Sequence, residues 1–302
     1  MIDLVNSIND VKAVIARDFD SSLNVEYIER GTEHFVALID KKYVARFPRT
    51  QKIAINAYYV DNLLFRLKDS PLFVPYTLYK KDSPLYFVSS YINGNHLIAK
   101  QINNLNISKK QDLADKYANF AAKLHGQFDV KEEMSIQHKY GLSKNRQLSW
   151  QDYFDKAVYN RAFPTQAQDI IAKEYYNKWQ SNKGSLPLVL LHDDLHLENI
   201  LFLDNTLVGV LDFGDVNIGY SEQEFRQLYK LGDDILNMAL QTYNLQTGRS
   251  LKAENVKNWA IMTQLASYSE RWATNAMGHP AFARACEDLN VWLPEGQWGL
   301  NL

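Results

Sequence analysis

Four residues in one stretch of the chain have the types and the spacing that phosphoryl transfer requires. His192, Asp194 and Asn199 form the pattern His-x-Asp-x-x-x-x-Asn, and Asp212 opens a literal Asp-Phe-Gly. Transfer from ATP needs one carboxylate that orients the attacking hydroxyl and accepts its proton. It also needs a second carboxylate and an amide oxygen that hold Mg²⁺ against the phosphates. The pattern therefore predicts Asp194 as the base, and Asn199 and Asp212 as the metal ligands.

The residues between these groups predict that they come together. Residues 201–203 and 207–211 are short apolar runs, and the turn-forming Asp-Asn-Thr between them predicts a β-hairpin. The loop with Asp194 and Asn199 precedes the first strand of that hairpin, and Asp212 ends the second. The three side chains should therefore meet at one end. Asp and Asn also occupy turns for backbone reasons alone, but two matched motifs in this order favour a kinase-type site over coincidence.

The stretch from residue 192 to residue 215 resembles the catalytic motif and the metal-binding aspartate of the aminoglycoside phosphotransferase family. That family has the protein-kinase-like fold and includes macrolide kinases, choline kinases and other small-molecule kinases. Its usual pattern is His-Gly-Asp-Leu-His-Pro-Gly-Asn-Ile-Leu, followed by Ile-Asp-Phe-Gly-Asp. This chain departs from the pattern at Asp193, Leu197 and Glu198, which are loop-shaping positions. Farther on, Glu224 occupies the position where relatives often have an Asp that braces this loop, and the longer acid can still reach it.

The resemblance extends, more weakly, toward the N-terminus. Residues 31–49 resemble the first hairpin of the family, which implies that a loop at Gly31 covers the nucleotide phosphates and that Arg46 contacts the α- and β-phosphates. Arginine is fully charged and bidentate, so this role is physically possible, although many relatives have Lys there. A single glycine fits an ordinary turn about as well. For Arg46 we favour the phosphate role over a surface cation on a strand.

Residues 52–68 have the apolar periodicity of a helix. The resemblance implies a helix here whose Glu pairs with the basic residue of the preceding strand. The corresponding position is Val60, and Asp61 follows it. One residue is a rotation of about 100° around a helix, so Asp61 is not an obvious substitute. The sequence leaves open whether Asp61 replaces the missing Glu.

The next segment concerns the nucleotide base. Residues 72–78 and 85–91 have the composition of two strands, with a turn predicted at residues 80–82. The resemblance places a hinge between two lobes after the second strand, where backbone groups would hydrogen-bond adenine above a floor of apolar side chains. The implied hinge residues are Ser90, Tyr91 and Ile92, and the implied floor residues are Leu201 and Leu211. Plain core packing is the other interpretation of the two leucines, and both can hold together.

Helical patterns dominate the residues after the hairpin, at roughly 222–244, 252–275 and 279–289. This half is moderately acidic, with Asp233, Asp234 and Glu270 on the predicted helices. An acidic wall would suit a polyamine-like acceptor such as an aminoglycoside through charge complementarity. A solvated helix face explains the same residues at least as well.

The composition limits the classes of protein to which the chain can belong. The chain has 302 residues, 46% of them hydrophobic, and a net charge of −2, which is enough for a large core and favours neither nucleic acid nor a membrane surface. The chain has no run of 18 or more apolar residues, so we expect no membrane span. Asp3, Asn9 and Asp10 interrupt any signal-peptide pattern. The single cysteine, Cys286, excludes an internal disulfide and fits a reducing compartment. We therefore expect a cytoplasmic protein, and a monomer.

Together these features predict an α+β, protein-kinase-like fold with a small antiparallel-sheet N-terminal lobe and a mainly helical C-terminal lobe. Residues 1–92 would form the nucleotide-binding lobe, and residues 93–302 the catalytic and substrate-binding lobe. The predicted activity is transfer of the γ-phosphate of ATP or GTP to a hydroxyl of a small molecule, with Mg²⁺ as cofactor. The resemblance favours an aminoglycoside acceptor and hence antibiotic resistance. A macrolide, or a choline-, homoserine- or sugar-like metabolite, fits the catalytic residues equally well.

A non-catalytic nucleotide-binding protein with a kinase-like fold is the rival prediction. The missing helix Glu near Val60 and the poor glycine loop favour it slightly. The intact Asp194, Asn199 and Asp212 argue against it, because a protein freed from catalysis has no physical need for all three.

Overall fold

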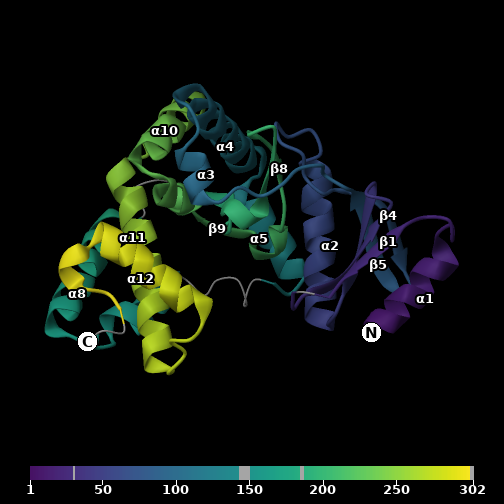
Figure 1. Cartoon of the computed structure of the whole chain (residues 1–302), viewed down its shortest axis with the longest axis horizontal. Coiled ribbons are helices and arrows are strands. Elements are labelled where there is room, and N and C mark those ends of the chain that lie inside the picture. Colours follow the sequence, from purple (N-terminus) through teal and green to yellow (C-terminus); the bar gives the residue numbers. More distant parts are fainter. Residues whose placement is uncertain (30, 143–149, 184–186, 300–302) are drawn as a thin grey trace.

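The chain is divided into a sheet-containing N-terminal part and a mainly helical remainder, which lie side by side along the longest axis of the molecule (Figure 1). The computed structural model describes residues 1–29, 31–142, 150–183 and 187–299. Within these ranges no helix is both long enough and apolar enough to cross a membrane. The division into a small antiparallel sheet followed by helices is the predicted one.

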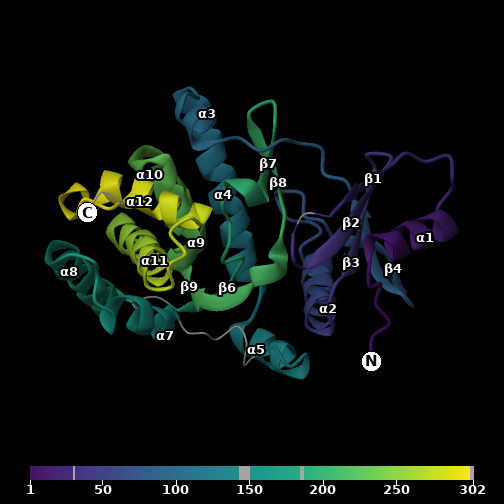
Figure 2. The ribbon, with the colours of Figure 1, turned by 60° about the horizontal axis from the view of Figure 1, so that its bottom comes forward.

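The N-terminal sheet is antiparallel throughout, and its strands lie in the order β1-β2-β3-β5-β4. Its strands are β1 (Val25–Ile28), β2 (His34–Ile39), β3 (Tyr43–Pro48), β4 (Thr77–Asp82) and β5 (Leu85–Ser90). Alternation along β3 buries Ala45 and Phe47 on one face and turns Arg46 to the other. Helix α1 (Ile8–Asp18) covers the first face, and the predicted helix, α2 (Gln51–Arg66), covers the second (Figure 2).

The predicted turn at residues 80–82 is wrong, because β4 continues through these residues and the chain turns at Ser83 and Pro84. The strand also begins later than predicted. Both carboxylate oxygens of Asp18 lie 2.9 Å from Lys81 Nζ, which ties this edge strand to α1. Consecutive lysines and an aspartate are typical of a turn, but an edge strand solvates such side chains equally well. Local composition therefore could not place the turn.

Helices make up most of the remaining chain. The longer ones are α4 (Ile107–Gln127), α5 (Val130–Lys139), α8 (Gln166–Asn182), α10 (Asp233–Thr247), α11 (Ala253–Ala273) and α12 (Pro280–Trp292). The shorter α-helices are α3 (Ala99–Asn103), α7 (Trp150–Phe154) and α9 (Ser221–Phe225). The helices predicted at 252–275 and 279–289 are confirmed. The single helix predicted at 222–244 is wrong, since Gly232, with φ +106°, divides it in a conformation that glycine adopts readily and a helix cannot contain.

Two pairs of short antiparallel strands carry the predicted motifs. The predicted hairpin is confirmed as β7 (Ile200–Leu203) and β8 (Thr206–Val210), which lie between α4 and the N-terminal part (Figure 2). Strand β6 (Leu188–Leu191) pairs with β9 (Asn217–Tyr220). The loop of residues 192–199 therefore leaves β6 and enters β7, and the Asp-Phe-Gly stretch leaves β8 and enters β9. Both connections start from largely buried strands, so the positions of the polar residues that follow these strands are set by the packing of the strands.

A buried carboxylate on α5 holds helix α2 against the helical part. Glu133 has no exposed surface. Its oxygens accept hydrogen bonds from the guanidinium of Arg66 and, at 3.2 Å, from the hydroxyl of Tyr59. Gln137 of the same helix donates to that hydroxyl at 3.1 Å. The C-terminal half of α2 is therefore fixed to the larger part of the molecule by an ion pair whose acid is fully buried.

We predict that Arg66→Met lowers the free energy of unfolding by about 3 kcal/mol, because it leaves the buried charge of Glu133 without its counter-ion. Urea denaturation measures the loss. The control is Lys116→Met, which removes the lysine of an exposed pair with Asp112 on α4 and should cost less than about 1 kcal/mol. Equal losses in the two variants would mean that the Arg66 pair does not anchor α2.

Candidate active site

The 192–199 loop brings the predicted base and the predicted amide ligand into contact. Asn199 Nδ2 donates one hydrogen bond to the backbone carbonyl oxygen of Asp194 at 2.9 Å and another to its Oδ2 at 3.1 Å. These bonds fix the orientation of the amide. Asn199 Oδ1 accepts no hydrogen bond from a described residue, so this oxygen is available to a cation.

His196 supports Asp194 from within the same loop and is not among the predicted site residues. Its Nε2 lies 3.2 Å from Asp194 Oδ2. Burial by itself would raise the pKa of Asp194, but the hydrogen bond and charge of His196 outweigh it, and the pKa lies below its usual value. The same hydrogen bond raises the pKa of His196. Asp194 is therefore ionised near neutral pH, and its Oδ1 remains for a hydroxyl group.

His192 ties this loop to its neighbours on both sides. Its backbone N–H donates to Glu224 Oε2 at 2.7 Å, so the longer acid does reach the loop. Its ring Nε2 lies 2.8 Å from the carbonyl oxygen of Leu211. The ring also packs edge-on against Phe213, with 4.6 Å between centroids. Because Leu211 and Phe213 flank Asp212, the imidazole sets the position of the Asp-Phe-Gly stretch relative to the loop.

Asp193 stands where the usual pattern has glycine, and it keeps a glycine-like conformation. Its φ of +62° lies in the left-handed region, which Asp tolerates better than most residues. Arg226 Nη1 lies 2.8 Å from Asp193 Oδ1 and Nη2 donates to its carbonyl oxygen, while Trp150 Nε1 donates to Oδ2 at 3.3 Å. Burial raises the pKa of Asp193 to about 6, against the lowering effect of Arg226. A buried ion pair thus holds the loop where the family uses glycine.

Asp212 leaves β8 in a left-handed conformation (φ +56°, ψ +71°) that turns the chain sharply. Its Oδ1 accepts a long hydrogen bond, 3.4 Å, from the N–H of Gly214. A Cβ on Gly214 would lie 3.1 Å from Glu33 Oε2 and 3.2 Å from Asp212 Oδ1. The glycine of Asp-Phe-Gly therefore lets two carboxylates approach the same backbone. Glu33 lies far away in sequence, and no local pattern indicated it.

Arg46 is positioned without an acidic partner from helix α2. Asp61 does not replace the missing Glu, since its Oδ2 lies 3.7 Å from Nζ of Lys80 in β4, and Val60 packs against the core. Burial lowers the pKa of Arg46, and the charge of Asp212 opposes that effect, so the two side chains share one region. In the described part of the chain no carboxylate comes within 4.0 Å of the guanidinium of Arg46. Asp212 is the acidic residue whose charge acts on it.

Helix α2 instead reaches the Asp-Phe-Gly stretch directly. Asn56 Nδ2 donates to the carbonyl oxygen of Gly214 at 3.0 Å. This contact joins the N-terminal part to the segment that carries Asp212. Asn56 was not predicted, because an isolated asparagine on a helix carries no signal of its own.

The predicted hinge connects β5 to the helical part. Ser90 is the last residue of β5, and the N–H of Tyr91 donates to the carbonyl oxygen of Lys42 at 2.7 Å. Ile92 is buried against Gly209, where a Cβ would lie 2.8 Å from Ile92 Cγ2. The hinge is thus packed directly on strand β8, and one of its N–H groups is already used within the sheet.

The remaining predicted residues are Leu201, Leu211 and Gly31. Leu201, in β7, is buried, and Leu211, directly after β8, is half-buried. Both lie at the end of the hairpin that is opposite its turn. A Cβ on Gly94 would lie 3.0 Å from that of Leu201, so the segment after the hinge passes close over β7. Gly31, in the connection between β1 and β2, has φ +95°, a conformation that favours glycine.

The side-chain oxygens of Asn199 and Asp212 suit a cation that binds together with the phosphates of a nucleotide. No group of three or more His, Cys, Asp or Glu side chains within the described ranges could hold a metal ion by itself. Asn199 Oδ1 and the Asp212 carboxylate are oxygen ligands, which Mg²⁺ prefers, and Mg²⁺ commonly binds through one or two carboxylates together with substrate phosphates. Asn199 and Asp212 therefore have the kind of oxygen donors that a nucleotide-bound Mg²⁺ would need.

Comparison with known proteins identifies the kind of protein to which this site belongs. A family model described as the phosphotransferase enzyme family matches residues 24–253, more than half of the chain. No curated protein sequence matches this chain.

Solved structures with a similar fold come from antibiotic phosphotransferases. The GDP and kanamycin complex of APH(2″)-IIIa has a TM-score of 0.73 at 18% identity, covering 94% of this chain and 98% of that chain. The streptomycin and ATP complex of APH(2″)-IIa has a TM-score of 0.65 at 19% identity, covering 94% and 97%. The apoenzyme of macrolide 2′-phosphotransferase MphH from Brachybacterium faecium has a TM-score of 0.67 at 18% identity, covering 93% and 97%. These similarities confirm the predicted two-lobe, protein-kinase-like fold.

We predict that Arg226→Met destabilises the protein more at high pH than at low pH. Without its counter-ion, Asp193 must be either charged and buried or protonated, and protonation becomes harder as the pH rises above the carboxyl pKa. The loss in the free energy of unfolding should be about 3 kcal/mol at pH 8 and clearly smaller at pH 5. Urea denaturation at both pH values measures it.

The matched control is the double variant Asp193→Asn/Arg226→Met, which removes the titrating group. Its difference from the parent should change much less between pH 5 and pH 8. A single-variant loss that is the same at both pH values would show that the charge of Asp193 is not what Arg226 compensates.

Proposed function

The chain belongs to the phosphotransferase enzyme family, and on this premise we propose that it transfers the γ-phosphate of ATP or GTP to a hydroxyl group of a small molecule. The observation that carries the proposal is the contact of Asn199 with Asp194, in a loop whose His192 ring bonds to the residue before Asp212. Such a set can act by positioning and charge neutralisation, without a covalent enzyme intermediate. A non-catalytic protein would gain nothing from an ionised carboxylate held open in this way.

On the acceptor side, Asp194 would orient the hydroxyl through Oδ1 and take its proton as the new O–P bond forms. His196 holds the other oxygen and keeps the carboxylate ionised. Asn199 Oδ1 and the carboxylate of Asp212 would hold Mg²⁺. When bound, this ion supplies neutralising charge to the phosphates of the donor nucleotide.

On the donor side, Arg46 would contact the α- and β-phosphates, and the connection at Gly31 would lie over them. The charge of Asp212 acts on Arg46, which supports the proposal that both side chains serve one phosphate-binding region. Bidentate hydrogen bonding from a guanidinium suits phosphate oxygens.

The nucleotide base would lie at the hinge, between Ser90, Tyr91 and Ile92 and a floor formed by Leu201 and Leu211. Because the N–H of Tyr91 is engaged within the sheet, we expect the base to bond to the backbone of the residues on either side of it. We accordingly propose residues 1–92 as the nucleotide-binding lobe and residues 93–302 as the catalytic and substrate-binding lobe.

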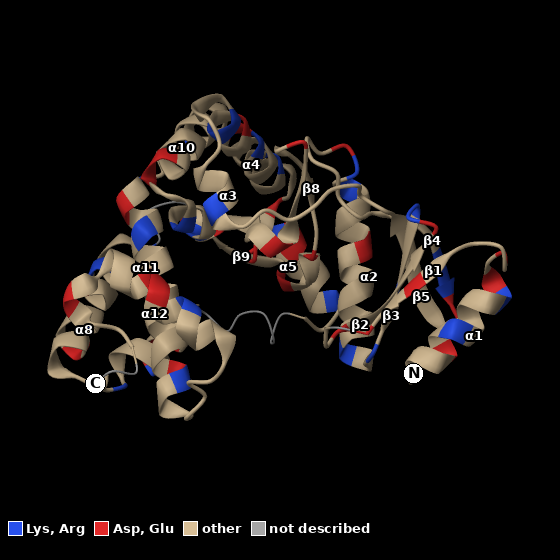
Figure 3. Ribbon diagram, in the orientation of Figure 1, with Lys and Arg blue, Asp and Glu red and all other residues tan. Residues whose placement is uncertain are grey.

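For the acceptor we propose an aminoglycoside, whose phosphorylation would confer antibiotic resistance, because structures with this fold bind kanamycin and streptomycin. The predicted acidic wall adds little support. Asp233 and Asp234 form ion pairs with Lys257 at 2.8 Å and Lys110 at 2.9 Å, and acidic and basic residues are mixed over the helical part of the molecule (Figure 3). A macrolide is the second candidate, since a macrolide 2′-phosphotransferase is about equally similar.

We predict an acceptor-dependent release of ADP or GDP when the protein is assayed with Mg²⁺ and a panel of aminoglycosides, macrolides, choline, homoserine and simple sugars. With the acceptor that gives the highest rate, Asp194→Asn should lower kcat by roughly 10²- to 10⁴-fold, because the amide cannot accept the hydroxyl proton. A coupled nucleoside diphosphate assay measures both results.

The matched control is Asp204→Asn in the exposed turn between β7 and β8, where asparagine tolerates the same left-handed conformation. Its rate should equal that of the parent. Full activity of Asp194→Asn would refute the assignment of the base. An absence of acceptor-dependent release with every compound, despite tight nucleotide binding, would favour the non-catalytic alternative.

A further inference from the structure

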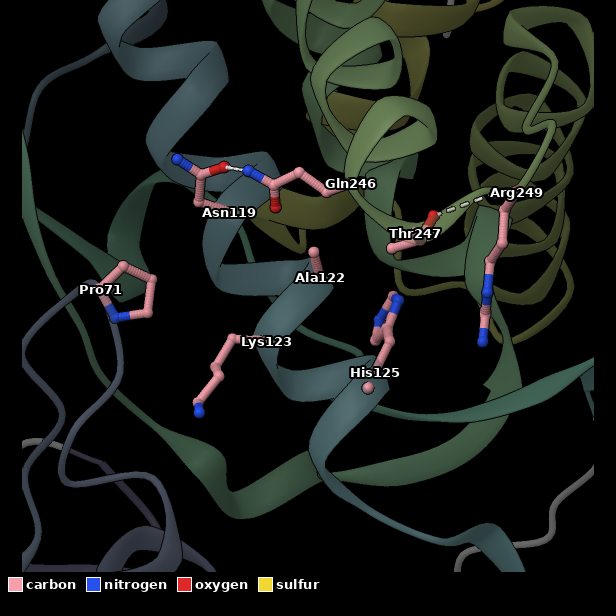
Figure 4. A pocket seen from close by; sticks show the side chains of 9 residues that line it. Pro71, Asn119, Ala122, Lys123, His125, Gln246, Thr247 and Arg249 are labelled. Atoms are coloured by element: carbon pink, nitrogen blue, oxygen red, sulfur yellow. Dashed lines mark hydrogen bonds between the residues drawn. The ribbon is translucent and has the colours of Figure 1, made fainter.

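A groove lies at the C-terminal ends of α4 and α10, and none of the proposed site residues lines it. Its volume is about 480 Å³, within the range of small-molecule sites. It is open to solvent and contains no carboxylate among its lining residues. The groove is lined by Pro71, Asn119, Ala122, Lys123, His125, Gly126, Gln246, Thr247 and Arg249 (Figure 4).

Two cations extend along this groove without acidic partners. Lys123 is exposed on α4, and Arg249 follows Gly248, whose left-handed conformation ends α10. Figure 4 shows their side chains on either side of His125. Within the described ranges neither Lys123 nor Arg249 forms an ion pair with a carboxylate. The carbonyl ends of two helices offset part of this charge, but each is equivalent to only about half an elementary charge.

The wall of the groove is hydrogen-bonded to the brace of the proposed active site. Arg249 Nη1 donates to the hydroxyl of Tyr243 at 3.3 Å, and that hydroxyl lies 2.7 Å from His125 Nδ1. On its other side, His125 Nε2 lies 3.5 Å from Glu224 Oε2, the atom that accepts the backbone N–H of His192. The series therefore runs from a surface cation to the loop that carries Asp194.

One atom of this series is left unsatisfied. Glu224 is 1% exposed, and its Oε1 has no hydrogen-bond partner among the residues that the structure describes. A buried carboxylate oxygen without a donor is costly, so the brace depends strongly on the contacts of the other oxygen. A change at His125 would reach His192 through that single oxygen.

We propose that this groove binds a small phosphate-bearing anion and that its binding is coupled, through His125 and Glu224, to the 192–199 loop. A guanidinium and an ammonium together suit an anion with several oxygens, because one binds two oxygens in its plane and the other acts as a point charge. By reciprocity, an anion that prefers one arrangement of the loop shifts the loop toward it. Anion binding in the groove does not depend on the proposed function, whereas any effect of the coupling on phosphoryl transfer rests on that function.

Inorganic pyrophosphate is the probe, titrated calorimetrically into the full chain in Mg²⁺-free buffer of low ionic strength. We expect saturable binding whose dissociation constant rises about tenfold or more in Lys123→Gln/Arg249→Gln, since each charged hydrogen bond removed is worth about a factor of ten. The variant Arg46→Gln, which changes the proposed nucleotide site, can remove a second binding event there but should leave the dissociation constant of the groove unchanged. Lys123→Gln alone should weaken it too, and the exposed Lys123 side chain forms no hydrogen bond or ion pair with another described residue.

Three outcomes would overturn the proposal. Pyrophosphate that does not bind would remove the site. Binding lost in Arg46→Gln but kept in the groove variants would assign the anion to the nucleotide site instead. Amide hydrogen exchange should change in the 192–199 loop when pyrophosphate binds the parent, and exchange that stays the same despite binding would refute the coupling. None of these results depends on catalysis, so a failed phosphoryl-transfer assay is distinguishable from a failed anion site.

Discussion

Two of the hydrogen bonds of His192 are the constraint on which the rest of the site depends. Its backbone N–H is held by Glu224, and its ring bonds to the carbonyl oxygen of Leu211. Because His192 is fully buried, both bonds are protected from water and worth more than surface contacts. They fix the start of the loop with Asp194 against the strand end with Asp212. A loop free to move here would separate Asp194 and Asn199 from Asp212.

The second constraint is the charge buried beside that histidine. Asp193 adopts the left-handed conformation that glycine would supply, and its carboxylate is neutralised by Arg226. Arg226 also lies 5.0 Å above the ring of Trp150, whose N–H reaches the same carboxylate. A buried ion pair seldom adds much net stability. Here we interpret it as specifying one loop shape, at the cost of sensitivity to the loss of either partner.

Much of this arrangement could be predicted from local patterns. The hairpin from residue 200, the antiparallel N-terminal sheet and helix α2 follow from apolar periodicity and turn residues, and the motif spacing indicated Asp194, Asn199 and Asp212. Pairings across long sequence distances could not be predicted, because they depend on packing. The contact of Arg226 with Asp193 and the tie of Arg66 to Glu133 are of this kind. For the same reason the sequence could not decide that Asp61 faces Lys80, away from Arg46.

Nucleotide binding in the presence and absence of Mg²⁺ tests the central claim most directly, because the claim is that Arg46, Asn199 and Asp212 surround the phosphates of one nucleotide. Isothermal titration of ATP and of GTP into the unmodified chain measures it. The account predicts saturable binding of at least one nucleotide, strengthened by Mg²⁺. An affinity that does not respond to Mg²⁺, or no binding of either nucleotide, would contradict it.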